Sequence, residues 1–381
     1  FRSPGGRLRD RWEVKNPRRL AVTPEGKLLA ISDARIVGVS GEEVETVAEK
    51  HLAAPAGIAT DTEGRIYVAN RGRRQNVSIF SPLGTYLRSI GREGGRPRAG
   101  RWIPSGMLDP GGIDIDAEGR LWVAETRDAP KRISVWNTET GELVTDYFGG
   151  SHYSTYASMD PADIGRVYCH GVQWKVDVDR GTKRPEAVVA PDYATARMRV
   201  FTANNGRQYA TARVQKGAVG LFIRKGHRFH LIAGVVHPNF FKDHAWYEDW
   251  QEELPRRTRH VLWSDDNGDM EPAAGEVVPS PLPVAYSGGW VDRDLSIYGT
   301  SRWHSVKAYR LRAAGIQDNG IPTYDPAEVQ SYGPGRTDPV ATNRRGAEAC
   351  ASNGDGRLSV AAADGPLGRS RLSPCLRLSP F

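Results

Sequence analysis

Short apolar runs separated by turn residues dominate the first 150 residues of the chain. Residues 55–70 read PAGIATDTEGRIYVAN, which is an apolar run, a polar turn at Glu63 and Gly64, and a second apolar run. Runs of this length bounded by Gly, Pro and Asp are typical of β-strands, and glycine supplies the positive φ of a tight hairpin. A helical period is confined to a short stretch near residues 245–254. The pattern therefore predicts an all-β protein.

The same hairpin recurs along the chain. Residues 17–32 read PRRLAVTPEGKLLAIS and residues 110–125 read PGGIDIDAEGRLWVAE, with turn glycines at Gly26 and Gly119. A second hairpin follows each later copy, turning at Gly84 and Gly141. Two hairpins make four antiparallel strands, which is one blade of a β-propeller. The starts lie 38 and 55 residues apart, and the Arg-, Gly- and Pro-rich segment 92–104 accounts for the longer interval.

Fainter copies extend the repeat through a single expected domain, residues 1–365. We expect four-stranded blades to begin near residues 17, 55, 110, 160, 200 and 260, with an insertion at 237–256. A last strand pair at 347–361 closes the ring, and residues 366–381 form a disordered tail. Six blades are predicted, or seven if the last pair opens a new blade.

Residues 55–91 and 110–149 resemble the NHL repeat, which reads Pro-x-Gly-Ile-Ala-x-Asp-x-x-Gly-x-Ile-Tyr-Val-Ala. The clear resemblance covers residues 17–150, and a fainter one reaches about residue 365. It implies a six-bladed propeller of TolB-like or gluconolactonase-like architecture. Such propellers include binding modules, lyases and lactone hydrolases, so the resemblance implies a fold rather than an activity. It also implies an extracytoplasmic or secreted protein, although no secretory signal is present in this chain.

The positive charge is local. The net charge is +7, and residues 1–101 hold 19 basic and 11 acidic residues, a net of +8. The arginines of this part lie among glycines and prolines with only Trp102 nearby, which favours solvated loops over a nucleic-acid surface. No apolar run is long enough to span a bilayer. The three cysteines, Cys169, Cys350 and Cys375, have no metal-type spacing, and their disulfide state stays open.

An acidic segment, residues 265–276, has the spacing of a calcium loop. Oxygen donors fall at loop positions 1, 3, 5, 7 and 12, namely Asp265, Asn267, Asp269, Glu271 through its carbonyl, and Glu276. Position 6 is Met270 where the usual pattern has glycine, and Pro272 forbids a normal exiting helix. The segment is therefore either an isolated structural calcium site or a plain acidic turn.

The insertion supplies a second group of candidates. Residues 237–250 contain five aromatic residues together with His237, Asp243 and His244. The spacing of the two histidines matches no helical metal site. These residues form either a ligand-binding loop or a small subdomain that packs its aromatic side chains onto the propeller.

The third group of candidates follows from the family resemblance. In calcium-dependent hydrolases of the gluconolactonase and paraoxonase type, side chains at inner-strand ends hold a central metal. The resemblance places Ser32, Asn70, Glu125 and His170 at such ends. Asn70 and Glu125 carry oxygen ligands that suit calcium, whereas His170 is softer than calcium prefers. The alternative is that these side chains line a polar, hydrated channel.

Together these patterns favour a non-catalytic binding or scaffold propeller, without excluding an enzyme. No phosphate loop, Gly-x-Ser-x-Gly elbow or Cys/His nucleophile pattern occurs in the sequence. We expect a monomer whose loops recognise a protein or a glycan, with structural calcium bracing one loop. The alternative is a metal-dependent, lactonase-like hydrolase or a lyase that acts at the channel mouth.

Overall fold

The computed structural model divides the chain into two compact units, residues 1–154 and 155–381. The sequence predicted one domain, residues 1–365. The structure describes residues 12–40, 43–127, 130–149, 157–160, 163–190, 198–214, 219–256, 258–282, 290–300, 308–332, 349–353 and 357–361. The expected tail at 366–381 and the start of the closing strands, 347–348, lie outside these residues.

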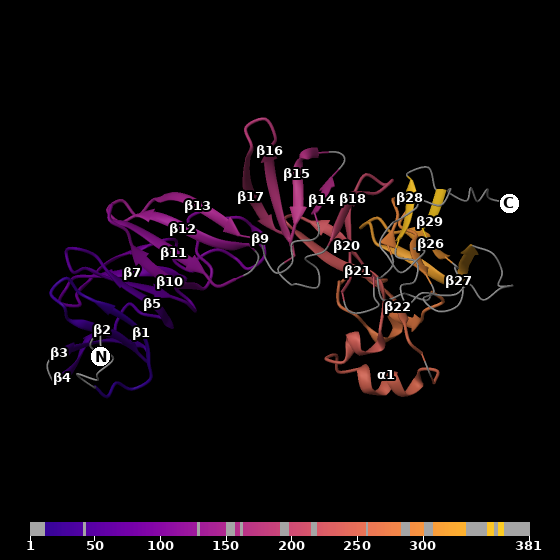
Figure 1. Ribbon diagram of the computed structural model, residues 1–381. Coiled ribbons are helices and arrows are strands. Elements are labelled where there is room, and N and C mark those ends of the chain that lie inside the picture. Colours follow the sequence, from indigo (N-terminus) through magenta and orange to yellow (C-terminus); the bar gives the residue numbers. More distant parts are fainter. Residues whose placement is uncertain are drawn as a thin grey trace, which may run out of the picture. The chain divides into compact units, whose positions relative to one another are not determined.

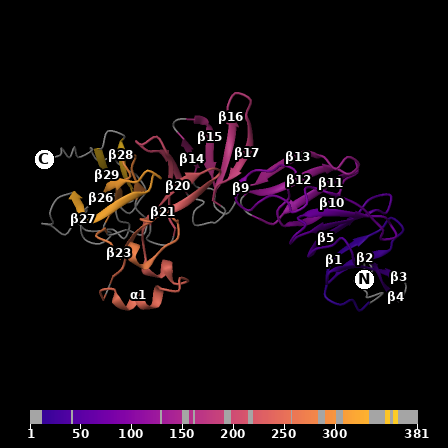
Figure 2. The same cartoon turned by 180° about the vertical axis from the view of Figure 1, so that it is seen from behind.

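Unit 1 contains three four-stranded antiparallel sheets, each with its strands in sequence order (Figure 1, Figure 2). The strands of the three sheets are β1 (Pro17–Val22), β2 (Leu28–Ser32), β3 (Arg35–Ser40) and β4 (Glu43–Ala48); β5 (Pro55–Thr60), β6 (Ile66–Asn70), β7 (Asn76–Phe80) and β8 (Tyr86–Ile90); and β10 (Pro110–Ile115), β11 (Arg120–Glu125), β12 (Lys131–Asn137) and β13 (Leu143–Gly149). The short strand β9 (Gly100–Arg101) lies between the second and third sheets in sequence.

Unit 2 is also built from antiparallel sheets. Its strands are β14 (Ala157–Asp160), β15 (Asp163–Cys169), β16 (Val172–Asp177), β17 (Thr182–Val188), β18 (Arg199–Thr202), β19 (Gln208–Ala212), β20 (Val219–Lys225), β21 (Arg228–Val236), β22 (Val261–Ser264), β23 (Val277–Pro279), β24 (Trp290–Val291), β25 (Ile297–Thr300), β26 (Ala308–Ile316), β27 (Pro322–Tyr332), β28 (Ala349–Asn353) and β29 (Arg357–Ala361). Strands β14 to β17, β18 to β23, β24 to β27, and β28 with β29 pair consecutively.

Among the described residues of unit 2, the helices lie in the insertion and in the acidic segment. They are the 3-10 helices η2 (Pro238–Phe241) and η3 (Ala274–Glu276) and the α-helix α1 (Tyr247–Glu253), where the sequence predicted a short helical stretch. No helix in the described part of the chain is long and apolar enough to cross a membrane. The predictions of an all-β protein and of four-stranded antiparallel sheets are confirmed.

One strand lies in a different sheet from the one expected. The sequence assigned residues 261–264 to a sixth sheet that begins near residue 260, whereas β22 pairs with β21 and extends the sheet that begins at β18. Strand β21 is nine residues long, and its apolar C-terminal half, Ala233–Val236, offers a second edge that the buried strand β22 covers. The next sheet starts at β24 instead.

The sheets of unit 1 pack face to face through their second strands. Along β6, Ile66 and Val68 enter the core shared with the first sheet, while Tyr67 and Ala69 enter the core shared with the third. A strand buried on both faces reads as a continuous apolar run, which is why this segment lacks an alternating pattern. The first strands of neighbouring sheets lie side by side, β1 with β5 and β5 with β10. Strands β5 and β10 approach so closely that a Cβ on Gly57 would lie 2.0 Å from the carbonyl oxygen of Gly111.

In the second and third sheets of unit 1, an aspartate builds the turn between the first two strands. Oδ1 of Asp116 accepts the backbone N–H groups of Glu118 and Arg120 at 3.1 and 2.8 Å. Its Oδ2 accepts from Nε of Arg120 at 2.7 Å and Nε1 of Trp122 at 2.8 Å. Desolvation opposes ionisation, but these hydrogen bonds outweigh it and lower the pKa of Asp116 to about 2. Asp61 makes the equivalent bonds in the preceding sheet.

The turn glycines have the positive φ expected from the sequence, with 76° at Gly64 and 74° at Gly119. We predict that Gly64→Val lowers the free energy of unfolding by more than about 1 kcal/mol, because a β-branched residue resists this conformation. Urea denaturation measures the change. Gly112→Val in β10 is the control, because Gly112 has no positive φ and open space around its Cβ. Equal effects of the two substitutions would contradict the prediction.

Candidate functional site

The strand order gives unit 1 two chemically different ends. The turns 23–27, 61–65, 81–85, 116–119 and 138–142 lie at one end, which we call the turn end. The segments 12–16, 33–34, 49–54, 71–75, 91–109 and 126–127 lie at the other, which we call the connector end. Alternating antiparallel strands require this separation. The residues expected to line a channel in this unit lie at the connector end.

Three of those residues occupy equivalent places in their sheets. Ser32, Asn70 and Glu125 each end the second strand of a sheet and pair with the proline that begins the first, Pro17, Pro55 and Pro110. In unit 2, Cys169 holds the corresponding place opposite Ala157, and His170 follows it with a positive φ of 51°. Cys169 is a free thiol, whereas Cys350 and Cys375 fall where no side chain is described.

Ser32 and Asn70 fasten the segment that leads into their own sheet. The Ser32 hydroxyl donates to the backbone carbonyl of Lys15 at 2.6 Å. Oδ1 of Asn70 accepts the N–H of Ala53 at 2.9 Å, and its Nδ2 donates to Oγ of Ser78 at 2.9 Å. Ser78 in turn donates to the carbonyl of His51 at 2.8 Å. Asn70 is fully buried, and its side-chain oxygen is the hydrogen-bond partner of a backbone N–H in the connector.

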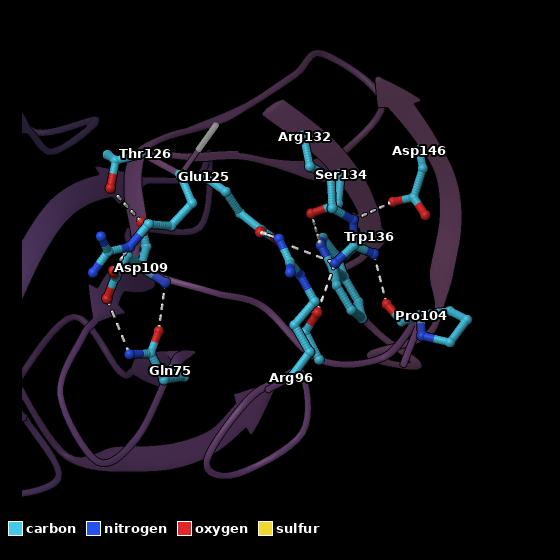
Figure 3. Close-up of polar contacts among 12 residues, drawn as sticks. Gln75, Arg96, Pro104, Asp109, Glu125, Thr126, Arg132, Ser134, Trp136 and Asp146 are labelled. Carbon is cyan, nitrogen blue, oxygen red and sulfur yellow. Dashed lines mark hydrogen bonds and ion pairs between the residues drawn. The ribbon is translucent and has the colours of Figure 1, made fainter. Parts of the chain in front are cut away.

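Glu125 fastens the longest connector through two arginines (Figure 3). Its Oε2 accepts from Nη2 of Arg96 at 2.6 Å, and its Oε1 accepts from Nη1 of Arg132 at 3.0 Å. Arg132 also donates to the carbonyls of Gly106 and Pro104 at 2.7 and 2.6 Å and forms an ion pair with Asp146 at 2.7 Å. We call Arg96, Glu125, Arg132 and Asp146 the connector clamp. It joins the segment 91–109 to β11, β12 and β13.

The connector clamp is balanced in charge and almost dry. The side chains of Arg96, Glu125 and Arg132 are at most 1% exposed. The Arg96 guanidinium lies 4.4 Å from the centre of the Trp102 ring, and burial lowers the pKa of Arg96 against the opposing effect of Glu125. Buried ions cost several kcal/mol each to desolvate, so each charge depends on its partners for compensation.

Further contacts pin the rest of the connector end. The side-chain amide of Gln75 donates to Asp109 at 3.1 Å, and Nε of Arg71 donates to the carbonyl of Pro110 at 3.1 Å. Glu93 accepts from Arg74 at 3.3 Å and from Asn76 at 2.9 Å. Several basic side chains of this end remain exposed, namely Lys50, Arg73, Arg92, Arg98 and Arg101. The arginine-rich loops therefore have fixed backbones and exposed charges.

The acidic segment 265–276 folds as a tight turn after β22. Asp265 is fully buried and accepts the N–H groups of Gly268 at 2.9 Å and Met270 at 3.1 Å. Met270 has a φ of 66°, which is the left-handed conformation that glycine normally supplies at this loop position. Glu276 closes the turn by accepting the N–H groups of Asp266 and Asn267 at 3.1 and 3.2 Å.

The carboxylates of this segment have no basic partner, since none of the ion pairs of the described residues includes one. Burial and the nearby Glu276 and Asp269 raise the pKa of Asp265, although its hydrogen bonds with N–H groups oppose the shift. Asn267 donates to Asp269 at 3.0 Å, and Asp269 accepts the N–H of Glu271 at 2.7 Å. Within the described residues, no group of three or more His, Cys, Asp or Glu is arranged to hold a metal. The calcium site therefore stays a prediction.

The insertion forms a small aromatic core of its own. Phe241, Tyr247 and Trp250 are buried against Val236 and Trp263, which agrees with the subdomain interpretation. Nδ1 of His237 accepts the N–H of Asn239 at 3.2 Å, Asp243 is exposed, and His244 stacks on Trp246 with ring centres 5.4 Å apart. Trp246 donates to the carbonyl of Pro272 at 3.0 Å. That bond joins the insertion to the acidic segment.

The sequence pattern did not predict the partners of Glu125. Arg96 lies in a basic run that indicated solvated loops, yet it is 2% exposed. A signal for Arg132 was present in β12, where Arg132, Ser134 and Trp136 alternate with exposed or oppositely facing residues and are all buried. An arginine in register with a core tryptophan predicts a buried cation, which requires a buried carboxylate nearby.

Comparison with known proteins finds solved structures that are distantly similar to the chain. No family model matches the chain, and no curated protein matches it. Among solved structures, hydrazine synthase of Kuenenia stuttgartiensis has a TM-score of 0.30 and 15% identity over 80% of this chain and 79% of that one. Virginiamycin B lyase from Staphylococcus aureus has a TM-score of 0.29 and 10% identity over 91% of both chains. A nidogen/laminin complex has a TM-score of 0.29 and 18% identity over 55% of this chain and 76% of that one. Likenesses at this level assign neither a family nor an activity to the chain.

The connector clamp makes a stability prediction. Glu125→Gln keeps the shape of the side chain but leaves Arg96 and Arg132 buried without their shared carboxylate. We expect it to lower the free energy of unfolding by about 3–5 kcal/mol, measured by urea denaturation. The matched control is Glu63→Gln, because the Glu63 side chain is 72% exposed beside Arg65. This substitution should lower the free energy of unfolding by less than about 1 kcal/mol. A loss for Glu125→Gln no larger than that of the control would contradict the role of the clamp.

Proposed function

We propose that the chain is a non-catalytic binding or scaffold protein of the NHL type, a six-bladed propeller whose loops recognise a protein or a glycan. A seventh blade would form if β28 and β29, which pair with each other, open a new blade instead of closing the ring. The observation that carries the proposal is that the side chains of Asn70 and Glu125 are fully engaged in hydrogen bonds within the protein. Both were candidates for metal ligands in a channel, and both have side chains engaged in fastening connectors.

A catalytic ligand must keep an atom available to metal or substrate. Asn70 is fully buried with its carbonyl oxygen and amide both in use, and each oxygen of Glu125 accepts from an arginine. Recruiting Glu125 to a metal would leave two buried guanidinium groups to be compensated elsewhere. Rigid sheets that carry pinned loops suit recognition, because the loops then need little ordering when a partner binds.

Enzyme assays test this proposal. The purified chain, supplied in turn with Ca²⁺ and Zn²⁺, is incubated with aliphatic lactones and aryl esters. We expect the chain to hydrolyse these substrates no faster than the metal ion does without protein. We expect Asn70→Ser to change the stability of the folded protein and no catalytic rate. Metal-dependent turnover that Asn70→Ser removes from a still folded protein would instead establish the hydrolase alternative. Circular dichroism and unfolding curves of both proteins report folding.

We also propose that calcium braces the segment 265–276. Asp265, Asn267, Asp269 and Glu276 supply oxygen donors in the order that calcium loops use, and the carbonyl of Glu271 adds a fifth. The left-handed Met270 and the lack of any described basic partner for these carboxylates support the proposal. Asn267 and Asp269 now share a hydrogen bond with each other, and calcium would take their side-chain oxygens as ligands.

Removing calcium tests the brace. A chelator should lower the melting temperature of the wild-type protein, because a ligand that binds only the folded state stabilises it. Asp269→Ala should abolish the difference between calcium and chelator, while Glu248→Ala on the exposed side of α1 should retain it. If the chelator does not change the melting temperature of the wild-type protein, the calcium site is refuted and the segment is a plain acidic turn.

A further inference from the structure

We propose that the connector end of unit 1 binds an acidic polysaccharide through its exposed Lys50, Arg73 and Arg92. The inference rests on the proposed recognition function and names the class of ligand. Three observations support it: the charge of this end, the fixation of its backbone, and the kinds of side chain that it does and does not expose.

Charge separates the two ends of unit 1. The connector segments hold ten basic and five acidic residues, a net of +5. The turns of the opposite end hold two basic and seven acidic residues, a net of −5. An anionic chain is therefore attracted to one end and repelled from the other, which orients its approach.

The exposed cations stand on a fixed backbone. Arg73 lies between Arg71, which bonds to Pro110, and Arg74, whose carbonyl accepts the N–H of Gly94 at 2.8 Å. The backbone N–H of Arg92 donates to Ser105 at 2.7 Å, and the connector clamp holds the same segment further along. A pinned loop loses little entropy when a ligand binds to its side chains.

These cations are available to a ligand. Lys50, Arg73 and Arg92 are exposed, and none of them forms an ion pair with a described residue. Arginine forms paired hydrogen bonds to carboxylate and sulfate groups. Regularly spaced groups of these two kinds are the charged chemistry of acidic polysaccharides.

The described connector segments lack the features that nucleic-acid-binding and protein-binding surfaces usually have. Single-stranded nucleic acid stacks on exposed aromatic side chains, but Trp102 is 7% exposed beneath Arg96 and Trp12 is half-buried. The exposed His51 ring is already stacked on Tyr86. Duplex readout uses a helix or a β-ribbon that enters a groove, and the described connectors contain neither. No large apolar side chain is exposed in the described connector segments, so an anchor for a protein interface is missing there.

Binding of a heparin dodecasaccharide to the full chain, measured by titration calorimetry in about 0.15 M salt, tests the proposal. We expect binding, and we expect Lys50→Ser, Arg73→Ser and Arg92→Ser in one variant to weaken it at least about tenfold and to reduce its salt dependence. The matched control replaces three exposed cations of unit 2, Lys225→Ser, Arg228→Ser and Lys242→Ser. It should bind like the wild type.

Three outcomes would overturn the proposal: no binding of heparin, an equal loss in the control variant, or equal affinity for duplex DNA of the same charge. We expect the DNA to bind at least about tenfold more weakly. Failure here is distinguishable from failure of the proposed function. If the chain does not bind heparin and shows no turnover, only the polysaccharide inference is overturned. Turnover would overturn the scaffold proposal even if heparin binds.

Discussion

The polar side chain that ends the second strand of each sheet is the constraint on which unit 1 depends. In a repeat of four-stranded sheets, a segment must return from the last strand of one sheet to the first strand of the next, and its backbone groups need partners. Ser32, Asn70 and Glu125 meet this need in three different chemical ways. The longest connector, residues 91–109, has the most contacts of this kind. Glu125 binds Arg96 of that connector and Arg132 of β12, and Arg132 in turn contacts Pro104, Gly106 and Asp146.

The same architecture explains how opposite charges come to lie at opposite ends. Carboxylates such as Asp61 and Asp116 build the hairpin turns, since they cap several N–H groups at once. Arginines gather in the connectors, where long side chains can reach carbonyl oxygens of neighbouring segments, as Arg71 does. Structural needs at the two ends therefore produce an electric polarity that a ligand can use.

Local patterns were enough to predict much of the fold. The Glu-Gly turns, the prolines at sheet starts and the apolar run of β6 identified the strands of unit 1, because each depends on neighbours in sequence. Long-range pairing could not be predicted in the same way. The pairing of β22 with β21 spans the whole insertion, and the partners of Glu125 lie 29 and 7 residues away. Burial of Arg96 depends on Trp102 and Glu125 together, and composition indicated only a solvated basic loop.

The extra strands β22 and β23 alter how the fifth sheet ends. Without them, the apolar C-terminal half of β21 would present unpaired backbone groups along an exposed margin, which invites strands of other molecules to add. Strand β23 is only three residues long and finishes at Pro279, whose ring nitrogen has no hydrogen to donate. These two strands, which follow the insertion, thus end the sheet with a short edge that offers few backbone groups to another strand.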